Sequence, residues 1–144
     1  MRRRDMVLIG CAALALAGCE FADPIVAERP DPETLLPPKV AVTRIETLEL
    51  GRLAEGYVLT AFGDAPGGGY YQPELKLRYG GATAADGFYE FDFLVRPPED
   101  PAKYAGAPES ARRMRADTAL TVQQLRGARG VRVWSASDSV EGRF

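Results

Sequence analysis

The chain contains no histidine and only two cysteines among its 144 residues. Without an imidazole there is no His base for a Ser or Cys triad, no HExxH zinc site and no histidine-based pH switch. The formal net charge is only −2, and the four charged residue types make up 26% of the chain. This balance is typical of one ordinary soluble domain, and the chain is too short for an enzyme of several domains.

Long hydrophobic runs are scarce too, and the clearest one is short. After an Arg-Arg-Arg start, twelve residues from Met6 to Ala17 carry no charge. As a helix this run would rise about 18 Å, less than the roughly 30 Å of a hydrocarbon layer. A basic start followed by a short apolar run is typical of a secretory signal peptide.

The run ends in the residues Leu16, Ala17, Gly18 and Cys19. These resemble the lipobox of bacterial lipoproteins, in which small residues precede the Cys that becomes the first mature residue. The resemblance covers residues 1–19 and implies that residues 1–18 are a cleaved signal peptide. It also implies that Cys19 carries a diacylglyceryl group and an acylated amine, with fatty chains such as palmitate. Two or three such chains hold a protein firmly at a membrane.

Other interpretations of this stretch stay open. Ala15-Leu16-Ala17 also fits the Ala-x-Ala site of ordinary signal peptidase, which would release a soluble protein starting at Gly18. The stretch could instead be a buried helix of a cytoplasmic protein. If the lipobox is used, the residue after Cys19 is Glu20 and not Asp. The family's sorting rule then favours the outer membrane, facing the periplasm, over the inner membrane.

Cleavage before Cys19 changes the charge and the cysteine count of the mature chain. Losing three arginines and one aspartate lowers the net charge from −2 to −4, and losing Cys11 leaves Cys19 as the sole cysteine. An acidic domain lacks the positive field that nucleic acid requires, so we expect no nucleic-acid partner. With no internal disulfide, stability has to come from the core.

Five of the chain's 11 prolines lie between residues 20 and 38. Because proline lacks an amide donor and restricts the residue before it, this segment is predicted to be an extended tether. With the lipidated Cys19 it forms the region 19–38, which spans at most about 60 Å at roughly 3.1 Å per residue. Alternatively, its apolar residues could pack onto the domain as an edge strand.

Residues 39–144 are predicted to form a single, mainly β domain. We expect an antiparallel sandwich or small barrel of about six or seven short strands, with one possible short helix from Pro108 to about Ala116. No repeated strand–helix–strand spacing is present, which argues against a parallel α/β fold. These residues carry no motif by which we recognise a family.

The clearest strand covers residues 88–95, where apolar and polar side chains alternate. Glu90 and Asp92 are expected on its solvated face. The strand at residues 74–79 alternates as well, which places Tyr79 in the core, and residues 80–87 are predicted to join the two as a hairpin. The core-facing side chains of the first strand are predicted to be Tyr89, Phe91, Phe93 and Val95.

No catalytic, cofactor or metal site is evident, so we expect a protein that is not an enzyme. Glu90 and Asp92 could act as acid and base at a glycosidic bond only if they lined a cleft. Asp64 and the Gly67-Gly68-Gly69 run lack the Lys and Ser or Thr of a phosphate loop and the repeated oxygen ligands of a calcium loop. A flexible turn is the expectation there.

Candidate contact residues lie in the predicted loops 63–72 and 97–117, because loops on a rigid scaffold commonly bind partners. The loop tyrosines that could stack on a sugar or peptide are Tyr70, Tyr71 and Tyr104. The arginines that could bind an oxyanion or an acidic partner are Arg112, Arg113 and Arg115. On the predicted helix the first and last of these arginines share one face. Ordinary packing and a solvated helix would explain the same residues.

Three hypotheses on function follow. The leading one is a membrane-anchored lipoprotein of the bacterial cell envelope that acts as a non-catalytic interaction or structural module, with an envelope protein as its partner. The second is a carbohydrate- or peptidoglycan-binding module that uses the loop tyrosines. The third is a hydrolase that uses Glu90 and Asp92.

Overall fold

The structure is a computed structural model that describes residues 31–144, which form one unit. The predicted signal peptide and the lipidation site at Cys19 lie outside the described residues. The strands are β1 Val40–Ala41, β2 Arg44–Leu53, β3 Gly56–Asp64, β4 Tyr71–Leu77, β5 Phe88–Arg96, β6 Arg113–Thr121, β7 Gly130–Trp134 and β8 Ser139–Arg143. The single-turn 3₁₀ helices are η1 Pro32–Leu35, η2 Pro101–Tyr104 and η3 Glu109–Arg112.

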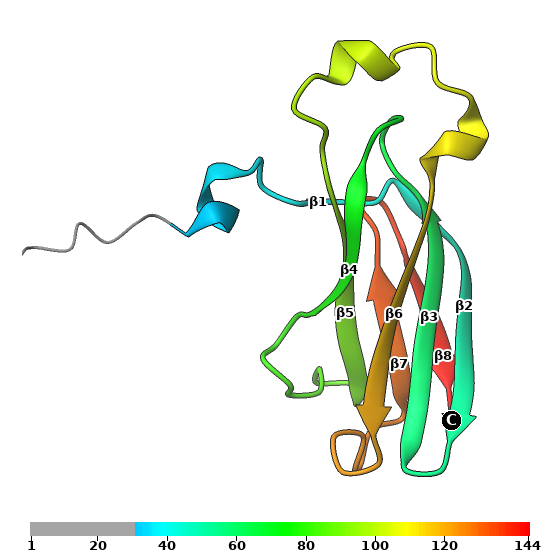
Figure 1. Cartoon of the computed structure of the whole chain (residues 1–144). Coiled ribbons are helices and arrows are strands. Elements are labelled where there is room, and N and C mark those ends of the chain that lie inside the picture. Colours follow the sequence, from blue (N-terminus) through cyan, green and yellow to red (C-terminus); the bar gives the residue numbers. More distant parts are fainter. Residues whose placement is uncertain (1–30) are drawn as a thin grey trace, which may run out of the picture. The chain divides into compact units, whose positions relative to one another are not determined.

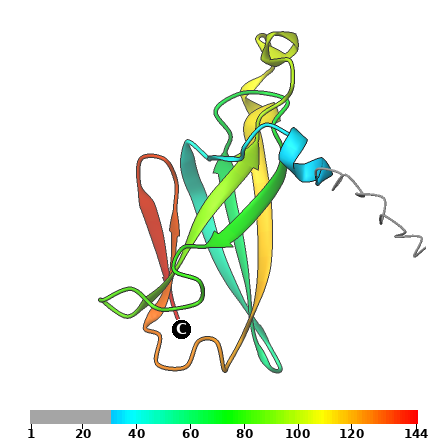
Figure 2. The same cartoon turned by 90° about the vertical axis from the view of Figure 1, so that its left-hand side faces the viewer.

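The strands form two sheets (Figure 1). Strands β2, β3 and β6 make a three-stranded antiparallel sheet with β3 in the centre. The second sheet is built around β5, which pairs antiparallel with β1 and β4 and parallel with β7. Strand β8 completes it by pairing antiparallel with β7. Figure 2 shows the same strands turned by 90°.

The predicted mainly β fold is therefore confirmed as a sandwich of two open sheets. It has eight strands in residues 31–144, where the sequence predicts six or seven. The parallel pairing of β5 with β7 also differs from the antiparallel expectation. Between these two strands the chain passes through β6 in the opposite sheet, and it therefore returns to β5 in the same direction.

The core lies between the sheets and contains the predicted apolar face of β5. All four of its predicted core residues are at most 2% exposed. The core residues that other strands contribute to the same cluster include Leu59, Ala61, Leu120, Val131 and Val133. Full burial of the leucine and valine side chains stabilises the fold by about 1.5–3 kcal/mol each. Tyr79, by contrast, is 52% exposed because β4 already ends at Leu77, so its predicted burial is wrong.

The helix predicted from Pro108 to about Ala116 is also wrong. Only the single turn η3 forms, and β6 begins directly after it at Arg113. Strand β6 pairs with β3 along its whole length, from Arg113 to Thr121. These inter-strand hydrogen bonds outweigh the weak helix preference of the Ala- and Arg-rich segment.

Glu90 departs most clearly from the expected solvated face of β5. Its side chain is 3% exposed, and its carboxylate accepts hydrogen bonds from Arg132 Nη1 at 2.5 Å and Trp134 Nε1 at 3.0 Å. Asp92 pairs with Arg78, whose guanidinium lies 4.5 Å from the centre of the Trp134 ring. Arg132 and Trp134 on β7 and Arg78, just after β4, therefore cover Glu90, and both carboxylates are engaged in ion pairs.

Candidate functional site

Two loops meet at one end of the sandwich, which we call the loop end (Figure 1). Residues 65–70 connect β3 to β4, and residues 97–112 connect β5 to β6 and include η2 and η3. The Ala65 amide donates a hydrogen bond to the Arg112 carbonyl at 2.8 Å, which joins the two loops. These are the loops that the sequence singles out for partner contact.

The glycine run at residues 67–69 packs closely against the second loop. A Cβ added to Gly69 would lie only 2.4–2.6 Å from ring atoms of Tyr104. One added to Gly68 would lie 2.5 Å from the Cβ of Ala107. Gly69 also has φ +77, a conformation that side chains with a Cβ rarely adopt. The glycines are therefore needed because the two loops pack closely here. The sequence predicts only a flexible turn and does not predict this packing.

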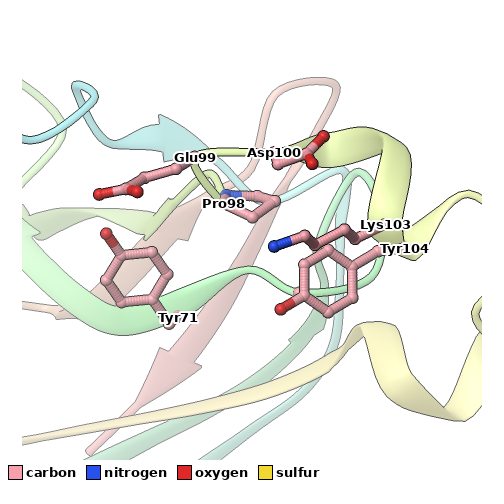
Figure 3. A pocket seen from close by; sticks show the side chains of 7 residues that line it. Tyr71, Pro98, Glu99, Asp100, Lys103 and Tyr104 are labelled. Atoms are coloured by element: carbon pink, nitrogen blue, oxygen red, sulfur yellow. The ribbon is translucent and has the colours of Figure 1, made fainter.

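A cavity of about 310 Å³ opens beside this contact (Figure 3). Its volume is at the lower end of the range for small-molecule sites, roughly 300–1,000 Å³. Figure 3 shows Lys103 reaching toward the space between two tyrosine rings, with Glu99 on the Tyr71 side. The lining residues are Gly69, Tyr71, Pro98, Glu99, Asp100, Lys103 and Tyr104.

The cavity offers three kinds of contact to a ligand. The rings of Tyr71 and Tyr104 present apolar faces, and their hydroxyl groups can donate or accept hydrogen bonds. The carboxylates of Glu99 and Asp100 are acceptors, and the Lys103 ammonium is a donor. Asp100 already accepts a hydrogen bond from the Ala102 amide at 3.2 Å, which caps the start of η2. This mixture suits a polar ligand that also has an apolar face.

The structure brings together two of the three tyrosines that the sequence singles out. Tyr71 is half-buried and Tyr104 is 42% exposed, and both line the cavity. Tyr70 instead packs against the hydrophobic core. Tyr70 is therefore a packing residue, and Tyr71 and Tyr104 are the two predicted tyrosines that line the cavity.

Arg112 and Arg115 do not share a helix face as predicted, because their segment continues as a strand. Arg112 ends η3 and lines a second cavity of about 270 Å³. Arg113 and Arg115 lie on β6, with their guanidinium groups 5.6 and 5.8 Å from the ring centre of Phe62. Their carboxylate partners are Glu46 and Asp117, respectively.

Opposite charges already pair in the second cavity. Arg44 Nε donates to Asp64 Oδ2 at 2.6 Å, and this hydrogen bond raises the pKa of Arg44. Glu109 and Arg112 complete its charged lining. No aromatic side chain is among the lining residues of the second cavity, and its charges largely neutralise one another.

The sequence does not predict the role of Arg96, the last residue of β5. Its side chain is 4% exposed, and its guanidinium donates to Gln72 Oε1 at 2.8 Å, the Pro37 carbonyl at 2.6 Å and Glu33 Oε1 at 3.0 Å. Residues 31–38, which we call the docked segment, are therefore held against the sandwich. This segment is the last part of the predicted tether, and it forms the turn η1 instead of the alternative edge strand.

Gln72 has an unusual backbone conformation next to the cavity residue Tyr71. With φ 50 it is the one non-glycine residue at positive φ within residues 31–144. The pairing of β4 with β5 shifts register between Tyr71 and Glu74, which places Gln72 in an irregular stretch. A left-handed non-glycine residue costs on the order of 1 kcal/mol and persists only where its surroundings hold it.

Other site types are not found in the described part of the chain. Within residues 31–144, no group of three or more Cys, His, Asp or Glu side chains is arranged to hold a metal ion. In the same part, no helix has the length and apolar character needed to span a bilayer.

Comparison with known proteins leaves the site to be interpreted from its own residues. No family model matches the chain, and neither a curated protein nor a solved structure matches it.

Proposed function

We propose that this protein is a lipid-anchored lipoprotein of the bacterial cell envelope that acts as a non-catalytic interaction module. The observation that carries the proposal is Leu16-Ala17-Gly18-Cys19 at the end of a short apolar run. The acyl chains on Cys19 would hold the domain at the membrane surface and raise its effective concentration near membrane partners.

The anchor is tested with two cysteine variants of the full chain. In Cys19→Ser the acceptor thiol is lost, so the protein should stay unprocessed or leave the membrane fraction. Cys11→Ser is the matched control, because Cys11 lies in the part that is cleaved, and it should behave like the wild type. An inhibitor of the lipoprotein signal peptidase should cause the precursor to accumulate. Normal processing and membrane binding of Cys19→Ser would refute the anchor.

The choice between the outer and the inner membrane is tested by changing the residue after Cys19. Glu20 favours the outer membrane under the family's sorting rule, and Glu20→Asp should shift the protein to the inner membrane. Density-gradient separation of the two membranes measures the shift. An equal distribution of the wild type and Glu20→Asp would contradict the outer-membrane assignment.

The loop end is the proposed contact surface of the module. Its cavity combines aromatic faces with unlike charged groups, while the carboxylate pair on β5 is engaged in ion pairs. An envelope protein that places a loop or a side chain in this cavity is the partner expected under the leading proposal.

A cell-wall glycan is the second candidate partner, and the pairing of Tyr71 with Tyr104 in one cavity favours it. A sugar ring has an apolar face that can stack on tyrosine, and its hydroxyl groups match carboxylate acceptors and an ammonium donor. Tyr71→Ala and Tyr104→Ala should each weaken binding to purified cell wall by about tenfold.

Tyr79→Ala is the matched control for this binding experiment, because Tyr79 is 52% exposed and is not among the cavity residues. It should bind as the wild type does. If the wild-type protein does not bind cell wall, or if all three variants bind equally well, the glycan candidate is eliminated. The protein-partner proposal then stands alone.

A further inference from the structure

The docked segment and the cavity are connected through two adjacent residues of β4. Tyr71, which lines the cavity, lies opposite Arg96 in the β4–β5 register. The next residue, Gln72, accepts the hydrogen bond from Arg96 Nε at 2.8 Å. Arg96 therefore contacts the docked segment through Nη1 and Nη2 and the strand that carries Tyr71 through Nε.

The conformation of Gln72 makes this connection sensitive to the docked segment. Its left-handed backbone, with φ 50, persists only where surrounding contacts hold it. The hydrogen bond from Arg96 is such a contact, and docking of Glu33 and Pro37 keeps the Arg96 side chain in place. If the segment leaves, Gln72 can relax, and Tyr71 is the neighbour that moves with it.

A second contact joins the same parts of the molecule. Lys39, which follows the docked segment, places its Nζ 2.5 Å from Glu74 Oε2 on β4. The chain after Arg96 leads directly to Pro98, which is buried and forms part of the cavity lining. The contacts of Arg96 and Lys39 therefore reach β4 within its register shift, at Gln72, and where regular pairing resumes, at Glu74. Arg96 itself lies two residues before Pro98 in the cavity lining.

We propose that docking of residues 31–38 on Arg96 holds Tyr71 in its position in the cavity, so that the linker to the membrane anchor controls the binding site. This rests on the proposed function, because it takes the cavity as the contact site and the N-terminal segment as the link to the membrane. With the segment docked, residues 20–30 span at most about 34 Å at roughly 3.1 Å per residue. Release lengthens this link and loosens Tyr71, so the site is best formed when the module is close to the membrane.

The test perturbs the docked segment without touching Gln72 or Tyr71. Glu33→Ala/Lys39→Ala removes both side-chain contacts described above from the segment side. Glu49→Ala/Arg126→Ala is the matched control, because it removes one acid and one base at exposed positions elsewhere. Hydrogen–deuterium exchange of the full chain reports on residues 31–38. Fluorine NMR of the fluorotyrosine-labelled chain reports on Tyr71, assigned through Tyr71→Phe, with Tyr79 as the reference.

We expect the double variant to exchange about fivefold faster over residues 31–38 and to shift the Tyr71 signal while the Tyr79 signal stays in place. Faster exchange with an unchanged Tyr71 signal would overturn the coupling. Unchanged exchange, or equal shifts of Tyr71 and Tyr79, would overturn it as well. Neither measurement uses a ligand or a membrane, so failure here leaves the proposed function to its own tests, and the reverse also holds.

Discussion

At the scale of single residues, the contact between Gly69 and the Tyr104 ring determines the shape of the cavity. Gly69→Ala places a methyl group within 2.6 Å of that ring and forces a Cβ into a left-handed conformation. It should lower the free energy of unfolding by about 1–2 kcal/mol and displace Tyr104 from the cavity. Urea denaturation measures the first effect, and fluorine NMR of labelled Tyr104 measures the second.

Gly106→Ala is the control for this change, because nothing lies within 4 Å of a Cβ at Gly106 and its φ is ordinary. It should leave both stability and the Tyr104 signal close to those of the wild type. Equal behaviour of the two alanine variants would show that the glycine contact does not shape the cavity.

Glu90 provides a second test at the residue scale. Glu90→Gln removes the charge that pairs with Arg132 on the covered face of β5. Arg132 keeps Asp86 and Glu141 as partners, but the Gln amide has only one acceptor oxygen for the two donors Arg132 Nη1 and Trp134 Nε1. One covered donor then loses its acceptor, so we expect a loss of about 2 kcal/mol in the free energy of unfolding. Glu49→Gln, at an exposed position on β2, should change it by less than about 0.5 kcal/mol. Equal unfolding midpoints in urea would contradict this reading.

At this scale, alternation along the chain predicts which side chains of β5 enter the core, because a strand has a period of two. It does not predict the burial of Glu90 or Arg96. The burial of Glu90 depends on side chains from β7, and that of Arg96 depends on β4 and the docked segment, so both follow from pairings between distant parts of the chain. The cavity is likewise only partly predictable, since loop position indicates Tyr71 and Tyr104 but does not distinguish them from Tyr70.

At the scale of elements, the β3–β6 pair contains a carboxylate whose ionisation contributes to folding. Thr60 Oγ1 donates to Asp117 Oδ1 at 2.6 Å, and Arg115 donates to the same carboxylate. The hydrogen bond from Thr60 and then that from Arg115 lower the pKa of Asp117 below its ordinary 3.8. The stability that ionised Asp117 contributes is fully present when the pH is above the ordinary pKa of 3.8. It is lost as the pH falls below 3.8 and passes through the lowered pKa of the folded protein.

Thr60→Val should therefore destabilise the protein at about pH 7 and by a smaller amount at about pH 3. Urea denaturation at both pH values measures the difference between variant and wild type. Thr47→Val, at an exposed position on β2, should show no such pH dependence. A difference between Thr60→Val and the wild type that stays constant from neutral to acidic pH would contradict the role of the hydrogen bond.

The elements themselves are predictable where local pattern and pairing agree, as in β5, where the strand predicted at residues 88–95 forms as Phe88–Arg96. The segment from Pro108 to Ala116 shows where they disagree. Its Ala and Arg residues favour a helix locally, but a central strand, β3, has a free edge to which Arg113–Thr121 pairs. Sequence alone does not show that edge, because β3 and β6 are separated by two strands and both loops of the loop end.

At the scale of the whole molecule, the proposed features form one arrangement. In the proposed arrangement, acyl chains on Cys19 would hold the protein at the membrane, and residues 31–38 of the predicted tether are docked on the sandwich. The sandwich supports two interlocked loops whose cavity is the proposed contact surface. Membrane distance and the state of the site are then linked through Arg96.

The anchor is the central claim, and intact-mass spectrometry of the protein from its native membrane tests it most directly. We predict a chain that starts at Cys19 and carries the mass of a diacylglyceryl group, with a further acyl chain on the new amine. A free, unmodified thiol at Cys19, or a mass that still includes residues 1–18, would contradict it.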